Sequence, residues 1–92
     1  MTEIQVQHRS ELGRFEINFQ NETAVLDYTL NGSTIIFTHM GVPSALEGQG
    51  IGSKLAKAGL DYARTNGLKV RALCWFVDGY IQRHPEYQDL VA

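Results

Sequence analysis

The sequence is poor in residues that would tie it to a disulfide framework, a metal or a membrane. Its 92 residues include one cysteine, Cys74, which excludes an internal disulfide. The histidines stand apart at positions 8, 39 and 84, a spacing unlike that of a zinc site, so we expect no bound metal. No apolar run approaches the roughly 20 residues of a membrane span, and the N-terminus lacks the apolar core of a signal peptide. We therefore expect a cytoplasmic protein that does not bind membranes.

Low-complexity tracts, internal repeats and linker-like segments are also absent. A chain this short cannot bury two cores, so residues 1–92 are predicted to form one domain, which we expect to be a monomer. The net charge of −2 is unevenly distributed, since residues 1–47 hold two basic and six acidic side chains and residues 48–92 hold six basic and four acidic ones. The overall acidity argues against nucleic acid as a partner, whereas the basic second half favours a small polyanion.

The first half of the chain is predicted to form an antiparallel meander of four strands. Apolar and polar residues alternate around positions 4–6, 15–19 and 24–30, and the run TIIFTHM at 34–40 gives the fourth strand. Asn31-Gly32 is a strong hairpin signal, because both central positions of a type I′ turn need positive φ.

The second half is predicted to contain a βαβ unit followed by a short helix. An amphipathic helix begins at about Gly50 and stops at Asn66-Gly67, with an apolar arc whose predicted centre includes Ala58 and Tyr62. Residues 68–75 are predicted to form a fifth strand, parallel to the fourth, and residues 76–83 a second helix. The fold class is therefore α+β with a mixed sheet.

Two candidate chemical groups lie near the ends of the predicted parallel strands. His39 is expected to share a strand face with Ile35 and Phe37, and Cys74 stands near the end of the fifth strand. We therefore expect His39 and Cys74 to face one crevice. A buried structural cysteine and a core histidine with one hydrogen bond remain the alternatives. Trp75 alternates away from Cys74 and is predicted to pack on the opposite face of the sheet.

A turn rich in glycine (Gly48, Gly50, Gly52) stands between the fourth strand and the main helix. Backbone amides at such a turn, together with the positive end of the helix dipole, bind anions without a basic side chain. The order of residues does not fit a P-loop or a Rossmann fingerprint, and the surface is too acidic for a nucleic-acid loop. The alternative is that the glycines serve only a tight connection.

The stretch LEGQGIGSKL resembles the acetyl-coenzyme A pyrophosphate motif of the GNAT superfamily of N-acetyltransferases, Gln/Arg-x-x-Gly-x-Gly/Ala. The tail KVRALCWFVDGYIQRHPEY is similar to the small YjdJ-type branch, and the resemblance covers roughly residues 14–90. Glu47 departs from the Gln/Arg of the motif, so the backbone, and not this side chain, would hold the phosphates.

The resemblance implies a pose for the cofactor, with the pyrophosphate on the glycine turn and the pantetheine arm along the fourth strand. Tyr80 is also a candidate proton donor to the departing thiolate, and the alternative is that it only packs. The residues expected to bind the cofactor are Met40, Gly41, Val42, Gly48, Gln49, Gly50, Ile51, Gly52, Ser53, Phe76, Val77 and Tyr80.

The resemblance further implies an acetyl-coenzyme A dependent N-acetyltransferase. One route passes through an acetyl group on Cys74, with His39 taking the thiol proton. The other is direct transfer, in which His39 or water deprotonates the acceptor amine. The acceptor is an amine on a protein, a peptide or a polyamine. The rival functions are a module that binds coenzyme A without efficient catalysis, and an interaction domain whose glycine turn is only structural.

Overall fold

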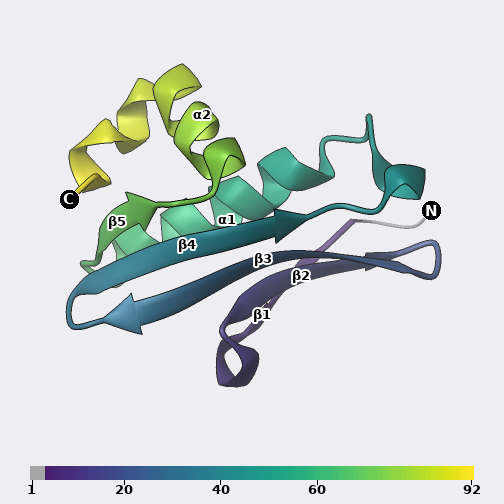
Figure 1. Cartoon of the computed structure of the whole chain (residues 1–92), viewed down its shortest axis with the longest axis horizontal. Coiled ribbons are helices and arrows are strands. Elements are labelled where there is room, and N and C mark those ends of the chain that lie inside the picture. The colour runs from purple at the N-terminus through teal and green to yellow at the C-terminus, as the bar shows by residue number, and fades with distance from the viewer. Residues whose placement is uncertain (1–3) are drawn as a thin grey trace.

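The computed structural model describes residues 4–92, which form one five-stranded sheet with its main helix packed on one face (Figure 1). The strands lie in the sheet in chain order, antiparallel from β1 to β4, and β5 pairs with β4 in parallel. Their bounds are β1 (Val6–Arg9), β2 (Arg14–Phe19), β3 (Glu22–Asn31), β4 (Thr34–Gly41) and β5 (Lys69–Ala72). The predicted α+β fold with a meander and a βαβ unit is confirmed.

Helix α1 (Ile51–Thr65) connects β4 to β5, and α2 (Trp75–Arg83) follows β5. Three short 3-10 segments complete the chain: η1 (Ser10–Leu12), η2 (Ser44–Leu46) and η3 (Pro85–Leu90). Among residues 4–92, no helix combines the length and the apolar character that crossing a membrane would require.

The first strand and the third turn differ from the predictions. Strand β1 begins at Val6 and runs to Arg9, because its ladder with β2 pairs Val6 with Ile17 and Arg9 with Arg14. In the β3–β4 hairpin Asn31 pairs with Thr34, so the central residues are 32 and 33 and not the predicted Asn31-Gly32. Only the first of them, a glycine, has positive φ (60°), as the first central position of a type II′ turn requires.

A bulge in the β3–β4 ladder overturns the predicted orientation of His39. Phe37 lies opposite Tyr28, but His39 lies opposite Asp27, so Thr38 is an extra residue on β4. The alternation of faces therefore slips by one position after Phe37. Phe37 is fully buried beneath α1, whereas His39 is exposed.

Helix α1 packs closely on the sheet, but its buried face is centred differently from the prediction. Leu55 and Leu60 are fully buried, whereas Ala58 and Tyr62 are half-buried. Tyr62 instead packs at the β1 side of the sheet, where its ring centroid lies 4.5 Å from that of His8. Close approach depends on Gly59, since an ideal Cβ there would lie 2.8 Å from the ring of Phe37.

Strand β5 is shorter than predicted because its ladder ends at Phe37. The amides of Leu73 and Cys74 both donate to the carbonyl of Phe37, at 3.0 and 3.1 Å, and the chain then turns into α2. Trp75 thus begins a helix and is 82% exposed, so the prediction that it packs on the opposite face of the sheet is wrong.

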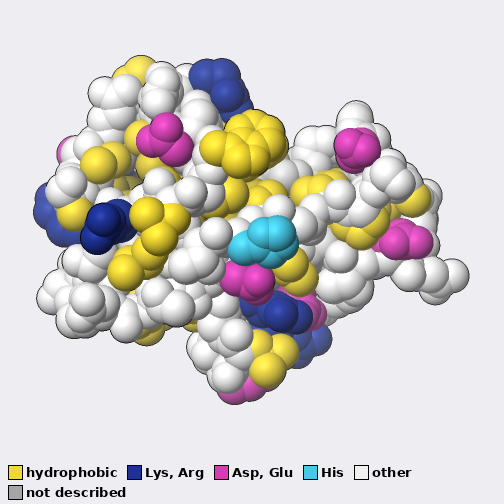
Figure 2. Space-filling view, in the orientation of Figure 1, with side chains coloured by type: hydrophobic (Ala, Val, Ile, Leu, Met, Phe, Trp, Pro, Cys, Tyr) yellow, Lys and Arg dark blue, Asp and Glu magenta, His cyan; other side chains and the backbone are white. Residues whose placement is uncertain are grey.

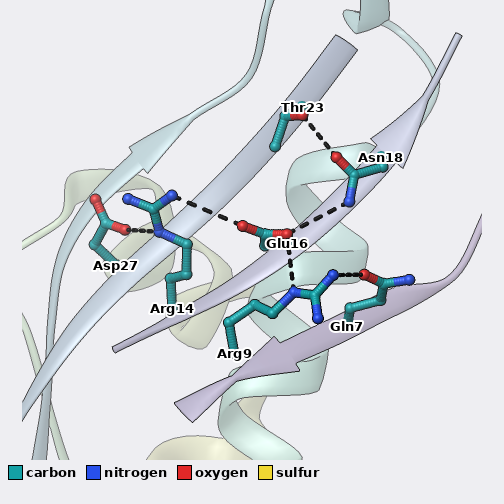
Figure 3. A network of polar contacts seen from close by, with 7 residues as sticks. All are labelled: Gln7, Arg9, Arg14, Glu16, Asn18, Thr23 and Asp27. Atoms are coloured by element: carbon teal, nitrogen blue, oxygen red, sulfur yellow. Dashed lines mark hydrogen bonds and ion pairs between the residues drawn. The ribbon is translucent and has the colours of Figure 1, made fainter. Parts of the chain in front are cut away.

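The face of the sheet opposite α1 carries a polar network (Figure 3). Glu16, buried between strands, accepts a hydrogen bond from Arg9 at 3.2 Å and lies 3.7 Å from Arg14. Arg14 also pairs with Asp27 at 3.2 Å. These contacts join β1, β2 and β3 side by side on this face.

The C-terminal tail is held against the rest of the domain. After η3, Val91 forms a parallel bridge with Val70, and the amide of Ala92 donates to the carbonyl of Val70 at 2.9 Å. The tail thereby protects part of the outer edge of β5.

Candidate functional site

A cleft of about 470 Å³ opens at the N-terminal end of α1. It exists because β4 continues to Gly41 while its ladder with β5 ends at Phe37 and Ala72, so the two strands part. The end of β4, the segment around η2, the first turn of α1 and the start of α2 supply its walls. The lining residues are Met40, Val42, Leu46, Glu47, Gly48, Gly50, Ile51, Gly52, Ser53, Trp75 and Phe76.

The first turn of α1 presents uncapped backbone donors to this cleft. Gly50 occupies the N-cap position with φ of 73° and supplies no side-chain cap. The first helical hydrogen bond runs from the amide of Lys54 to the carbonyl of Gly50, at 3.0 Å. Within the described residues, the amides of Ile51, Gly52 and Ser53 have no backbone acceptor. Free donors at the positive end of a helix dipole attract anions, so this wall favours a phosphate.

Glycine is needed at the three positions of the turn for different structural reasons. Gly48 and Gly50 have positive φ (82° and 73°), and no heavy atom lies within 4 Å of the place where a Cβ would stand. Gly52 has no such φ, but its Cβ would lie 2.7 Å from Cζ of Phe76, so it lets α2 approach α1. The first two glycines therefore keep the backbone open toward the cleft, and the third seats an aromatic wall.

The predicted cofactor-binding residues divide into two groups. Those that line the cleft are Met40, Val42, Gly48, Gly50, Ile51, Gly52, Ser53 and Phe76. The others, Gly41, Gln49, Val77 and Tyr80, do not line it. Val77 and Tyr80 belong to the buried core. Tyr80 stacks on His84 with ring centroids 3.9 Å apart, and its burial raises the pKa of the phenol.

Cys74 is buried at the point where β5 passes into α2. Its side chain is 7% exposed, and the residue occupies the N-cap position of α2, where its carbonyl accepts a hydrogen bond from the amide of Asp78 at 3.1 Å. Trp75 and Phe76, which follow it directly, line the cleft, but Cys74 itself does not. The thiol thus belongs to the core immediately behind one wall.

His39 lies on the other side of the sheet from Cys74. It pairs with Asp27, whose side chain belongs to the polar face, and its Nε2 atom lies 3.2 Å from where a Cβ on Gly41 would stand. His39 does not line the cleft. The expected common crevice for His39 and Cys74 is therefore not formed, because the bulge at Thr38 turns the imidazole to the open face.

Three lining residues were not among the predicted cofactor-binding residues: Leu46, Glu47 and Trp75. Glu47 belongs to the glycine motif, but its side chain was expected to take no part. Leu46 ends η2 and is fully buried, and nothing in the sequence distinguishes it from an ordinary core leucine. Trp75 did carry a signal, since α2 buries Val77, Tyr80 and Ile81. A helix that begins at Trp75 places this side chain away from that buried face.

Comparisons with known proteins show which family and which solved structure this chain is similar to. Residues 14–90 match a family described as GCN5-related N-acetyl-transferase. The protein NATD1 of Gallus gallus is 35% identical over 85 residues, which cover 89% of this chain and 77% of that one, and NATD1 of Mus musculus is 34% identical with the same coverage. The solution structure of a GCN5-like protein from Staphylococcus aureus matches with a TM-score of 0.78 and 32% identity, covering 100% of this chain and 91% of that one.

Proposed function

The chain belongs to the GCN5-related N-acetyltransferase family, and from this premise we propose that it binds acetyl-coenzyme A and transfers the acetyl group to an amine. The observation that carries the proposal is the cleft that joins uncapped amides of α1 to the free end of β4. The uncapped amides suit a charged diphosphate, and the free end of β4 suits a long flexible arm. Coenzyme A has both groups.

The amides of Ile51, Gly52 and Ser53 would hold the diphosphate. Gly48 and Gly50 fit this role, since both line the cleft and no heavy atom lies within 4 Å of the place where a Cβ would stand. Glu47 brings a negative charge to the same wall, so attraction must come from the amides and the helix dipole. Lys54, exposed on the next turn, adds positive charge nearby.

The arm that carries the thioester would lie along Met40 and Val42. Both residues follow the last rung of the β4–β5 ladder, where the parted strands leave an apolar strip. Phe76 forms the facing wall from α2. A thioester placed by this arm would come close to the start of α2, behind which Cys74 is buried.

The first route of transfer uses Cys74 as the nucleophile. Its sulfur would bond to the acetyl carbon while the bond from that carbon to the coenzyme A sulfur breaks, and the thiol proton would pass to the departing sulfur. The amine would then attack the same carbon, return a proton to Cys74 and leave as the N-acetyl product. The position of Cys74 beside Trp75 and Phe76 supports this route.

The second route is direct attack of the amine on the thioester. The proton of the amine would pass through His39 or water to the departing sulfur. His39 is exposed on the open face and does not line the cleft, so it would take this proton only from an acceptor that approaches from that face. Water would take the proton from an acceptor that enters the cleft. The proposed acceptor is an amine on a protein, a peptide or a polyamine.

Calorimetry with coenzyme A tests the proposed binding, and mass spectrometry after incubation with acetyl-coenzyme A tests the transfer. We expect binding, and about 42 Da of added mass on an amine or on the protein, the mass of one acetyl group in place of hydrogen. No binding at millimolar ligand would leave only an interaction domain. Binding without any transfer would favour a module that binds coenzyme A without efficient catalysis. The short η1 connection between β1 and β2 also supports this alternative, since it offers little surface to an acceptor.

Replacing Cys74 separates the two routes. We expect Cys74→Ala to abolish turnover and leave the affinity for coenzyme A nearly unchanged, because the residue does not line the cleft. His39→Ala is the matched variant, and in the cysteine route it should retain turnover because its side chain is on the open face. Retained turnover in Cys74→Ala, with loss in His39→Ala, would eliminate the covalent route.

A further inference from the structure

Trp75 combines two features that are seldom found together. It is the one tryptophan of the chain, and its side chain is 82% exposed although it lines the cleft. Tryptophan is highly buried on average, because its large apolar surface gains free energy on leaving water. An indole left in water at the mouth of a cleft therefore indicates a contact that the isolated chain does not make.

The core of the protein does not need this indole. Helix α2 packs through Val77, Tyr80 and Ile81, which are buried. With about 100° per residue, Trp75 points away from all three. Its neighbour Leu73 is also exposed, at 61%, but does not line the cleft. Figure 2, in the orientation of Figure 1, shows hydrophobic side chains at the surface where β5 passes into α2.

Trp75 is nevertheless held next to a fixed aromatic wall. Its ring centroid lies 6.0 Å from that of Phe76 in an edge-to-face arrangement. Phe76 is itself seated on Gly52 of α1, where a Cβ would lie 2.7 Å from the ring. The indole is thus positioned at the rim of a wall that faces Met40 and Val42 across the cleft.

We propose that the indole of Trp75 covers the apolar arm of the ligand in this cleft and determines how tightly that arm is held. The inference rests on the proposed function, because it assumes a ligand with a diphosphate on the amides of α1 and a flexible arm along β4. A chain lying against Met40 and Val42 would have one side open to water. The indole lines the same cleft and does not belong to the buried core, and covering the arm would remove both apolar surfaces from water.

The single tryptophan makes the contact directly measurable. Titration of the full chain with coenzyme A should shift the fluorescence emission of Trp75 to shorter wavelength as the indole leaves water. Calorimetry should show Trp75→Ala weakening coenzyme A binding about tenfold and Trp75→Phe weakening it less. Leu73→Ala is the matched control, and it should bind as the wild type does. Thermal unfolding should be nearly the same in all of these variants, since both side chains are exposed.

Fragments of the ligand show which part the indole covers. Pantetheine at high concentration should shift the emission, whereas adenosine 3′,5′-diphosphate should not. A full shift with the adenosine fragment alone would mean that the indole stacks on the adenine, and it would overturn the assignment to the arm.

The proposed function and this inference fail in different ways. Absence of coenzyme A binding to the wild type in calorimetry would overturn the proposed function and, with it, the inference. Normal binding to the wild type without a change in emission, and with equal affinity in Trp75→Ala, would overturn the inference alone.

Discussion

The two ends of α1 differ in how their polar groups are hydrogen-bonded. At the C-terminal end, Arg64 binds the carboxylate of Asp89 at 3.1 and 2.9 Å and the carbonyl of Glu86 at 2.6 Å, and Asn66 caps the carbonyl of Tyr62 at 2.9 Å. At the N-terminal end, Gly50 gives no side-chain cap. The C-terminal end of α1 is hydrogen-bonded to the tail of the chain, whereas the backbone amides at its N-terminal end remain open to the cleft.

The difference shows that the two ends of α1 serve different roles. The C-terminal end contributes to stability, and the N-terminal end offers hydrogen-bond donors to a ligand. A serine or aspartate at an N-cap stabilises a helix by about 1 kcal/mol relative to alanine but by only roughly a few tenths of a kcal/mol relative to glycine, so Gly50 leaves out the side-chain cap at little cost in stability. The polar contacts at the other end, together with the packing of Tyr87 and Leu90 in the core, hold the helix without it. The open donors are thus available to a ligand because other parts of the molecule stabilise α1.

Filling the open end should have the largest effect. In Gly52→Val the new side chain would stand where Phe76 and the cleft now meet, 2.7 Å from the ring at its Cβ alone. We expect coenzyme A affinity to fall about a hundredfold, measured by calorimetry, because the ring must move into the cleft and the first-turn amides become screened.

Ala58→Val is the matched control for this change. It introduces the same β-branched residue into the same helix at a half-buried position outside the cleft. Its affinity should stay within about threefold of the wild type. Equal affinity in Gly52→Val and the wild type would mean that the ligand does not use this end of α1.

Filling the middle of α1 should affect stability and spare binding. In Gly59→Ala the new Cβ would lie 2.8 Å from the buried ring of Phe37 and 3.2 Å from Leu26. Alanine in a helix gains roughly 0.5–1 kcal/mol over glycine, but overpacking a core costs about 1–3 kcal/mol. We therefore expect a net loss of about 1–2 kcal/mol in urea unfolding, with coenzyme A affinity unchanged.

Gly79→Ala in α2 is the control for the glycine change itself. Its Cβ would meet only the guanidinium of Arg83, at 3.2 Å, and that flexible end can move away. This variant should be neutral or slightly stabilised. If Gly59→Ala were stabilised as well, the ring of Phe37 would have moved to make room for the new Cβ. The packing of α1 on the sheet would then not depend on glycine at position 59.

Local signals in the sequence were sufficient for most of the fold. The stop at Asn66-Gly67 is confirmed, because Gly67 has φ of 66° and the amide of Leu68 returns to the carbonyl of Ala63 at 2.9 Å. The bulge at Thr38 had no such signal, because it depends on how Phe37 and Tyr28 pack under α1. The bridge between Val91 and Val70 likewise joins distant segments by tertiary contact.

The candidate site was predictable where the backbone alone defines it. The glycine turn and the first turn of α1 line the cleft as expected, since chain order places them together. His39 was misplaced because one bulged residue reverses the face of every later side chain on β4. Trp75 was misplaced because the fifth strand was predicted to end at residue 75, three residues after its observed end at Ala72, so the strand period was applied to a residue of α2.

At the tied end of the helix, the smallest effect is expected from Tyr87→Phe. The Tyr87 hydroxyl donates to Oδ1 of Asp61 at 2.6 Å, and burial together with this carboxylate raises the pKa of the phenol. Losing the bond should cost about 1 kcal/mol in urea unfolding at neutral pH, since Asp61 keeps its contact with Lys57 at 2.8 Å.

The raised pKa of the Tyr87 phenol also predicts a dependence on pH. The unfolded chain releases the phenol proton at a lower pH than the folded chain, so the free energy of unfolding falls as pH rises above the ordinary tyrosine range. That alkaline fall should be shallower in Tyr87→Phe, with binding of coenzyme A intact. Tyr62→Phe, a half-buried phenol with no hydrogen bond recorded for its hydroxyl within residues 4–92, is the control, and an equal loss in both variants would contradict a specific role for the bond to Asp61.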